Sequence, residues 1–286
     1  MHKAAYRLHL PKERTTSVLF NSPHSGRDYP WTFLRESILD ERTVRSSEDA
    51  FVDLLFANAP LCGAPLLAAT APRAFVDLNR SADELDPALI EGVRKTGHNP
   101  RVNSGLGVIP RVVANGRAIR SGKMPLTEAE DRLRNVWFPY HAKLQALLDE
   151  NLAQCGEAIL IDCHSMPHEA IESISRGKST PQVVLGDRFG AAANTDIVDR
   201  IQAIFEGVGL RVARNSPFAG AYITQHYGRP SKRQHAIQIE LDRSLYMDEA
   251  NVCPGRDFKG MQTLIASVVE QITEIGRFVA TPLAAE

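Results

Sequence analysis

The stretch AILIDCH, Ala158–His164, decides the fold. A short apolar run bounded by turn residues is typical of a strand that is buried on both faces of a sheet. Gly156 precedes this run and ends the longest amphipathic stretch of the chain, Leu126–Cys155, which predicts a helix. A second run, AIQIEL at Ala236–Leu241, predicts another strand.

Shorter strand and helix patterns alternate through the rest of the chain, which is the signature of an α/β fold. Strands are expected at residues 17–21, 65–70, 74–78, 182–185 and 210–213, and helices at 46–58, 191–205 and 258–278. Two long loop-like segments remain, 96–125 with a hairpin turning at Asn115-Gly116, and 214–234. No repeat or composition break marks a linker, so residues 1–286 are expected to form a single domain.

The composition excludes several classes of protein. Lys and Arg number 33 against 34 Asp and Glu in 286 residues, whereas binding nucleic acid through overall charge needs a basic excess. The longest uncharged stretch, residues 57–72, is shorter than the roughly 20 apolar residues that span a bilayer. Charges interrupt the N-terminus where a signal peptide needs an apolar run, and the four cysteines are scattered. We therefore expect a cytoplasmic protein that binds neither nucleic acid nor membrane.

Three polar residues follow or end predicted strands, where open α/β sheets bind their ligands. His24 follows the strand at 17–21, His164 ends AILIDCH, and Glu240 lies near the end of AIQIEL. A catalytic zinc takes three protein ligands from His and carboxylate side chains and leaves a fourth position open. The two histidines are therefore candidate ligands, and Asp49 is the best third.

Each of these residues also has an ordinary structural alternative. A histidine after a strand is commonly a solvated loop residue. Asp49 stands three residues after Ser46, which matches a variant of the capping box at a helix start. Glu240 shares a strand face with Gln238, as in a half-exposed strand with a polar outer side.

The segment APRAFVDLNR, residues 71–80, contains two arginines near one predicted strand end. Guanidinium groups make charge-assisted hydrogen bonds worth about 1.5 to 3 kcal/mol each, so Arg73 and Arg80 can hold an acidic substrate and a developing oxyanion. The alternative is surface ion pairing with Asp83, Glu84 and Asp86.

Together these stretches resemble the N-formylglutamate amidohydrolase family. The matching segments are NSPHSGRDYP (21–30), EDAFVDLLF (48–56), GLGVIPRV (105–112), WFPYHAKL (137–144), IDCHSMP (161–167), NSPFAGAYITQHYGRP (215–230) and QIELDRSLYMDE (238–249). Each is a weak signal alone, but their joint order is specific and covers most of the chain. That family is similar in turn to the zinc carboxypeptidase and aspartoacylase group of deacylases.

The resemblance implies a three-layer α/β/α sandwich with a mixed central sheet, carboxypeptidase-like, and one catalytic Zn²⁺. DLNR at 77–80 resembles the Asp-x-Asn-Arg of the deacylases, which implies that Asn79 and Arg80 bind a substrate carboxylate. Arg73 resembles the arginine that steadies the oxyanion. The implied reaction is hydrolysis of an N-acyl amino acid, with N-formyl-L-glutamate giving formate and L-glutamate as the favoured case.

One departure from the wider group concerns the acidic ligand. That group uses His-x-x-Glu, whereas Arg27 stands three residues after His24. In the EDAFVDLLF match Asp49 falls on the acidic position, with Glu48 as the alternative.

We therefore expect one zinc ion on His24, Asp49 and His164, with Glu240 as general base. The alternatives are a zinc deacylase or carboxypeptidase-like hydrolase acting on another N-acyl amino acid or a short peptide, and a metal-free protein that binds acidic ligands. Iron, cobalt or manganese also suits such ligands. The oligomeric state, and whether the segments 96–125 and 214–234 close over a substrate, stay open.

Overall fold

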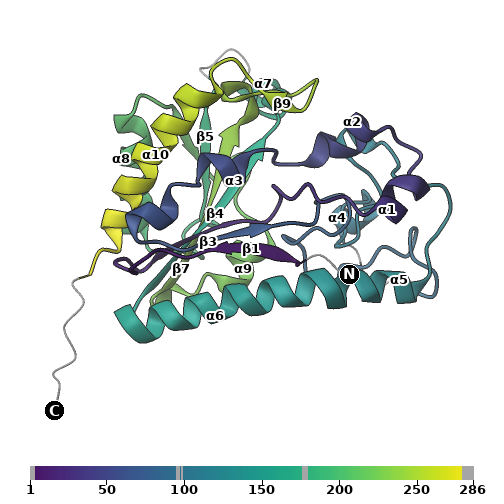
Figure 1. Ribbon diagram of the computed structural model, residues 1–286, viewed down its shortest axis with the longest axis horizontal. Helices are drawn as coiled ribbons and strands as arrows, with labels where there is room; N and C mark the ends of the chain where they lie inside the picture. The colour runs from purple at the N-terminus through teal and green to yellow at the C-terminus, as the bar shows by residue number, and fades with distance from the viewer. Residues whose placement is uncertain (1–3, 95–96, 98, 176–179, 279–286) are drawn as a thin grey trace.

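A mixed seven-stranded sheet forms the centre of the computed structural model, which describes residues 4–94, 97, 99–175 and 180–278 (Figure 1). The strands, in sheet order, are β1 (Tyr6–His9), β3 (Leu66–Ala69), β2 (Val18–Ser22), β4 (Ala158–Met166), β7 (Gln234–Asp242), β5 (Val183–Gly186) and β6 (Val212–Arg214). The central strands β3, β2, β4 and β7 are parallel, while β1 and β5 run antiparallel to their inner neighbours. The expected mixed sheet is confirmed. A separate two-stranded ladder joins β8 (Met247–Asp248) to β9 (Cys253–Pro254).

Helices cover both faces of this sheet (Figure 1). They are α1 (Trp31–Glu36), α2 (Glu41–Val44), α3 (Val52–Leu55), α4 (Pro100–Asn103), α5 (Leu126–Arg132), α6 (Phe138–Cys155), α7 (His168–Ser175), α8 (Thr195–Gly207), α9 (Tyr222–Tyr227) and α10 (Phe258–Ile275). Short helical turns lie at η1 (Arg45–Ser47), η2 (Ala59–Cys62), η3 (Ala114–Gly116), η4 (Leu133–Trp137), η5 (Pro230–Lys232) and η6 (Arg243–Leu245). The arrangement is the three-layer α/β/α sandwich that the sequence predicted. No helix among the described residues is both long and apolar enough to cross a membrane.

The alternation of side chains along β4 assigns its residues to two cores. Ile159 and Ile161 pack in the core that includes α8 and α10, whereas Leu160 packs with α6 and α9. All nine residues of β4 and all nine of β7 are buried, including the polar residues Asp162, His164, Gln238 and Glu240. Since residues two apart share a face, His164 lies on the α6 side.

The long helix expected at 126–155 is present as α5, the π-helical turn η4 and α6 in succession. The wide turn comes directly before Pro139, which has no N–H to donate to the carbonyl of Asn135. The interruption therefore follows from one proline.

Two predicted elements are wrong. Residues 74–78 form no strand, because the N–H groups of Phe75 and Val76 both donate to the Pro72 carbonyl and close a turn. The helix expected at 46–58 is broken: Glu48 to Ala50 lie outside any helix, and Phe51 has a left-handed φ of 67°.

The break in that helix has a tertiary cause. The Asp49 N–H donates to the His24 carbonyl at 3.0 Å, which takes the chain out of the helical path. The Ser46 hydroxyl donates to the Thr43 carbonyl instead of capping a following turn, so the capping-box alternative is wrong.

The segments expected to be loops are partly ordered. The hairpin at Asn115-Gly116 is confirmed by an antiparallel bridge between Val112 and Ala118. The 214–234 segment contains α9, which the sequence pattern did not predict. The pattern also did not predict β1 near the N-terminus. Thr96 and His98, within the predicted 96–125 loop, lie outside the described residues.

Candidate metal centre and substrate cavity

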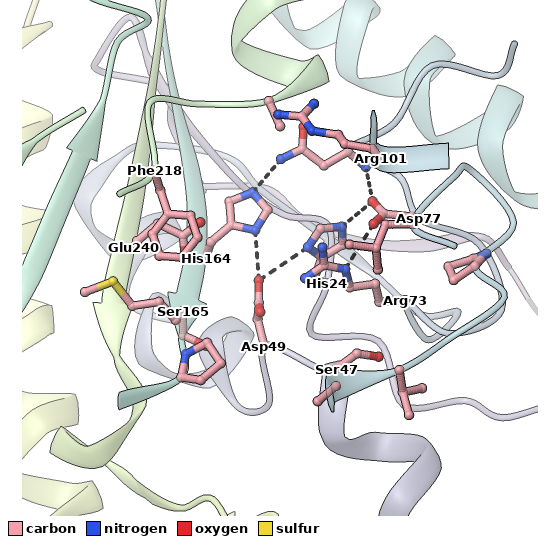
Figure 2. Close-up of a pocket in the computed structure, with 18 of the residues that line it drawn as sticks. His24, Ser47, Asp49, Arg73, Asp77, Arg101, His164, Ser165, Phe218 and Glu240 are labelled. Atoms are coloured by element: carbon pink, nitrogen blue, oxygen red, sulfur yellow. Dashed lines mark hydrogen bonds and ion pairs between the residues drawn. The ribbon is translucent and has the colours of Figure 1, made fainter. Parts of the chain in front are cut away.

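A cavity of ≈ 630 Å³ lies at the carboxyl ends of β2, β4 and β7 (Figure 2). Its volume is in the range of small-molecule binding sites. The lining includes every residue expected from the sequence to form the site: His24, Asp49, Arg73, Asn79, Arg80, His164 and Glu240. Segments far apart in the chain therefore converge on one cavity.

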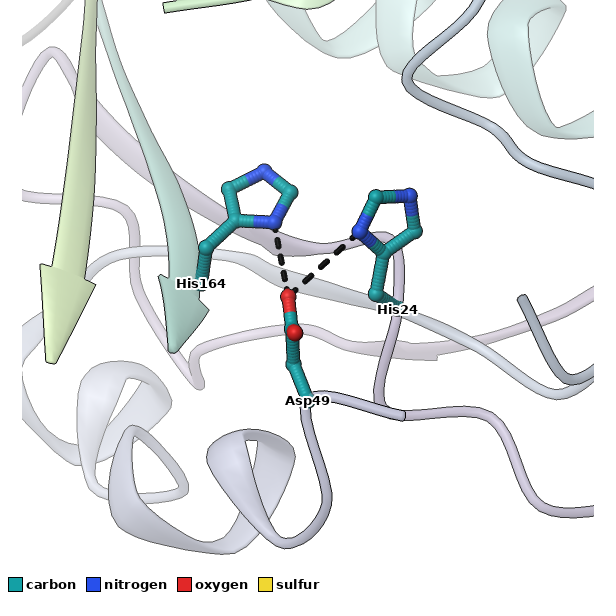
Figure 3. Close-up of side chains that lie close together, drawn as sticks. All are labelled: His24, Asp49 and His164. Carbon is teal, nitrogen blue, oxygen red and sulfur yellow. Dashed lines mark hydrogen bonds and ion pairs between the residues drawn. The ribbon is translucent and has the colours of Figure 1, made fainter. Parts of the chain in front are cut away.

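His24, Asp49 and His164 form a buried group that can hold a metal ion (Figure 3). One ligand atom from each residue lies within 4.8 Å of the other two. Asp49 Oδ2 lies 2.8 Å from His164 Nδ1 and 3.4 Å from His24 Nδ1. Two imidazoles and one carboxylate match the ligand set of a catalytic metal with an open position.

The contacts of His24 fit a metal at its Nδ1 atom. Its Nε2 lies 2.7 Å from Asp77 Oδ1, while Nδ1 is buried and makes no hydrogen bond. A histidine that ligates a metal through one ring nitrogen commonly donates the other N–H to a carboxylate. Asp77 therefore holds the ring with its free nitrogen turned toward Asp49 and His164.

His164 has both a donor and an acceptor beside its outer nitrogen. Asn79 Nδ2 and Asp162 Oδ1 each lie 3.1 Å from His164 Nε2. The Asn79 amide is oriented by Ile223, whose N–H donates to Asn79 Oδ1 at 2.8 Å. Asp162 is fully buried and neither of its oxygens is in a hydrogen bond. An unprotonated Nε2 can thus accept from Asn79, while the nearby charge of Asp162 favours a proton on the same nitrogen.

Asp49 is held by Arg243, which the sequence analysis missed. Arg243 donates to Asp49 Oδ1 at 3.0 Å and to the Ser165 hydroxyl at 3.2 Å, and it is only 5% exposed. This bond leaves Asp49 Oδ2 facing the two histidines. The available signal was the position of Arg243 one residue beyond β7, at the same sheet edge as the other site residues.

Glu48, the alternative acidic ligand, lies outside the three-residue group. Its carboxylate accepts hydrogen bonds from Arg45 at 3.0 and 3.1 Å and from the Tyr29 hydroxyl at 2.7 Å. Burial and the negative charge of Glu48 raise the pKa of Tyr29, so this phenol stays protonated. Asp49 is therefore the carboxylate that faces the histidines.

The carboxylates and His164 carry strongly shifted pKa values. Burial opposes the charge of Asp49, but the neighbouring imidazoles of His164 and His24 hold its pKa well below the ordinary value. Burial likewise opposes the charge of Asp77, yet His24, Arg73 and Arg80 lower its pKa. Burial lowers the pKa of His164, but Asp162 and Asp49 together raise it well above the ordinary value. Asp49 and Asp77 therefore stay ionised beside the two histidines.

Glu240 projects from β7 into the same cavity and is 8% exposed. Burial raises its pKa to about 7, against the opposing pull of His164. Gln238 donates to Glu240 Oε1 at 2.8 Å, which orients the carboxyl group. A carboxyl group of this kind exchanges protons near neutral pH, as a general base must. The half-exposed alternative for this strand is wrong, because β7 is buried throughout.

The two arginines of the APRAFVDLNR segment are both turned toward the site. Arg73 donates to Asp77 Oδ2 at 3.0 Å through Nε. Arg80 donates through Nε to the Leu106 carbonyl at 3.0 Å and through Nη1 to the Asn79 carbonyl at 2.8 Å. Neither forms an ion pair with Asp83, Glu84 or Asp86 in the described part of the chain, so the surface-pairing alternative is wrong.

Comparisons with known proteins agree with this arrangement. The sequence model of the N-formylglutamate amidohydrolase family matches residues 16–247. The chain is 32% identical to an N-formylglutamate deformylase of Pseudomonas putida, over 81% of this chain and 82% of the relative. It is 30% identical to the enzyme of the same description from Pseudomonas aeruginosa, over 83% and 85% of the two chains.

Solved structures give the same result. The crystal structure of an N-formylglutamate amidohydrolase from Ralstonia eutropha superposes with a TM-score of 0.90 at 32% identity, covering 96% of this chain and 99% of that one. A gene product of Agrobacterium tumefaciens shares the fold, with a TM-score of 0.66 at 14% identity over 96% and 97% of the two chains. The extent of the family match and the coverage of these relatives show that the chain belongs to the N-formylglutamate amidohydrolase family.

Proposed function

We propose that this protein hydrolyses N-formyl-L-glutamate to formate and L-glutamate, with one zinc ion held by His24, Asp49 and His164. The observation that carries the proposal is the convergence of these three ligands with Glu240 in one cavity of a chain of this family. The proposal treats residues 1–286 as a single catalytic domain, since the site residues come from most of the length of the chain.

The buried carboxylates prepare the two histidines for the metal. His24 donates Nε2–H to Asp77, which leaves Nδ1 as the ligand atom. His164 ligates through Nδ1, and the negative charge of Asp162, 3.1 Å from Nε2, favours the ring proton on that nitrogen. Arg243 fixes the third ligand by holding Asp49 Oδ1.

When bound at this site, zinc polarises the formyl carbonyl and lowers the pKa of water toward about 7. Glu240 accepts a proton from the attacking water at its carboxylate and delivers it to the leaving nitrogen. Such acid–base work contributes about 100- to 10,000-fold to the rate. Arg73 has no hydrogen bond beyond Asp77 among the described residues, so its terminal nitrogens are free to stabilise the developing oxyanion.

Arg80, with Asn79 beside it, binds the substrate α-carboxylate. Arg80 is nine-tenths buried, and its two hydrogen bonds go to backbone carbonyls instead of a carboxylate. Its charge is therefore open to pairing with a substrate anion. Asn79 joins this contact by giving up Gln238, the longest of its three side-chain contacts.

The test is formate release from N-formyl-L-glutamate by the metal-loaded protein, repeated after removal of metal by a chelator. We expect turnover to disappear with the metal and to return when zinc is added back. Glu240→Gln should keep the metal and lose about 100- to 10,000-fold in kcat. Unchanged turnover in Glu240→Gln with metal retained refutes the general-base assignment. A panel of N-acyl glutamates of increasing chain length separates a deformylase from a broader deacylase.

A further inference from the structure

Four arginines line the cavity, and two of them are neutralised by carboxylates of the protein itself. Arg73 pairs with Asp77 at 3.0 Å, and Arg243 pairs with Asp49 at 3.0 Å. These two positive charges are already balanced and serve the metal centre. A substrate carboxylate gains little from either by simple charge neutralisation, while the terminal nitrogens of Arg73 remain available to the developing oxyanion.

The other two arginines, Arg80 and Arg101, have no such partner. Among the described residues, no carboxylate forms an ion pair with Arg80 or Arg101, and the Arg101 guanidinium makes no hydrogen bond. Glu84 lines a neighbouring hollow together with Arg101, but the two form no ion pair. Two cations without an ion-pair partner in the described part of the chain therefore line one cavity, and Figure 2 labels one of them, Arg101.

The backbone holds these two arginines close to each other. The Leu106 N–H donates to the Arg101 carbonyl at 2.8 Å, and the Leu106 carbonyl accepts from Arg80 Nε at 3.0 Å. Burial lowers the pKa of Arg80, and the positive charges of Arg73 and Arg101 lower it further against the pull of Asp77. Like charges held at this proximity repel each other, and an anion bound between or beside them relieves the repulsion.

The two positions differ in depth. Arg80 is buried and adjoins Asn79, which touches the proposed metal ligand His164, so Arg80 lies near the bond to be broken. Arg101 is exposed and belongs to the short helix α4 at the rim of the cavity. A substrate held by its α-carboxylate at Arg80 extends its side chain away from the metal centre.

We propose that Arg101 binds the side-chain carboxylate of the substrate and thereby makes the cavity select N-formylglutamate over its neutral isostere N-formylglutamine. The inference rests on the proposed function and adds the residue that recognises the acidic side chain. Arg80 thus binds the α-carboxylate in the buried part of the cavity, and Arg101 binds the side-chain carboxylate at its rim.

The experiment measures kcat/KM of the zinc-loaded protein for N-formyl-L-glutamate, N-formyl-L-glutamine and the α-amide of N-formyl-L-glutamate. We expect the wild type to favour glutamate over glutamine by about 10- to 100-fold, the equivalent of one charge-assisted hydrogen bond. Arg101→Gln should reduce that ratio toward one through loss of glutamate turnover alone, with N-formylglutamine turnover and discrimination against the α-amide unchanged. Inhibition by the product L-glutamate should weaken in parallel.

Two further variants control for nonspecific effects. Arg229→Gln removes an exposed arginine that lines only the neighbouring hollow, and it should keep the wild-type ratio. Arg101→Lys keeps the charge and should keep part of the ratio, which a folding defect would not do.

The outcomes are distinct. A glutamate-to-glutamine ratio that persists in Arg101→Gln, or that is absent from an active wild type, overturns the role of Arg101. Loss of discrimination against the α-amide in Arg101→Gln also overturns it, because Arg101 would then bind the other carboxylate. A wild type that holds zinc but releases no formate from N-formylglutamate overturns the proposed function itself, and the inference with it.

Discussion

Three buried histidines lie in two environments that differ in charge: His24 and His164 in one, and His141 in the other. His24 and His164 are surrounded by the carboxylates of Asp49, Asp77 and Asp162. His141, on α6, contacts only neutral partners through its ring nitrogens: the Tyr227 hydroxyl at 2.9 Å and the Leu78 carbonyl at 2.9 Å.

The surroundings give the same residue type opposite properties. Burial lowers the pKa of His141 to about 3, so this imidazole stays neutral and serves packing against Trp137. The carboxylates around His164 overcome the effect of burial and raise its pKa. Burial alone therefore does not identify a functional histidine. Burial together with neighbouring carboxylates that lack hydrogen-bond partners in the protein does identify one.

Removing one histidine from each environment should give the largest difference in bound zinc and formate release. His164→Ala removes a proposed metal ligand, so we expect loss of bound zinc and formate release at the level of the blank. His141→Gln keeps a donor and an acceptor in the helix and should retain zinc and turnover. Metal analysis together with the formate assay checks both variants, and zinc retained in His164→Ala would contradict the assignment.

The pH dependence of stability tests the neutral histidine. The pKa of His141 is about 3 in the folded protein against 6.5 for the free side chain, so the unfolded chain binds a proton first as pH falls. Stability from this group is present above pH 6.5 and is lost between pH 6.5 and 3, by about 5 kcal/mol in all. Urea unfolding of wild type and His141→Gln across this range should show a difference that shrinks as pH falls. A constant difference would rule out this account.

Asp162 tests the contribution of the carboxylates around the proposed metal. Asp162→Asn removes the acceptor charge beside His164 Nε2, and we expect the zinc affinity to weaken by about 10- to 100-fold. Competition with a chelator measures this affinity directly. Cys163→Ala changes the opposite face of the same strand and should leave the affinity unchanged, even where it lowers the melting temperature. Equal affinities in wild type and Asp162→Asn would show that this carboxylate is a passive core group.

The smallest effect expected is the acid limb of the rate profile. Glu240 must be ionised to accept a proton, and its pKa is raised to about 7 by burial. A bound cation favours the carboxylate, so the limb should lie between the ordinary pKa near 4.5 and about 7, with kcat/KM falling about tenfold per pH unit below it. Glu240→Gln should lack the limb. If Glu240→Gln shows an acid limb with the same midpoint, the limb arises from the titration of another group.

The sequence predicted those parts of the molecule that depend on local pattern. The apolar runs of β4 and β7 specified two buried strands, and strand ends identified His24, His164 and Glu240 as neighbours. The predicted metal residues meet at one site, because parallel strands bring their carboxyl ends to one edge.

The parts that the sequence did not predict depend on partners far away in the chain. Asp49 leaves the helical path because it bonds to His24 and His164, and no helical pattern contains that information. Arg243 reaches Asp49 across 194 positions of sequence, and Asp77 reaches His24 across 53. Their roles arise from charge balance in the folded site.

The most direct test of the central claim is anomalous scattering from crystals of the active protein at the zinc absorption edge. The account predicts one strong peak within bonding distance of His24 Nδ1, His164 Nδ1 and an Asp49 oxygen. An active, formate-releasing protein with no peak at that position would contradict it.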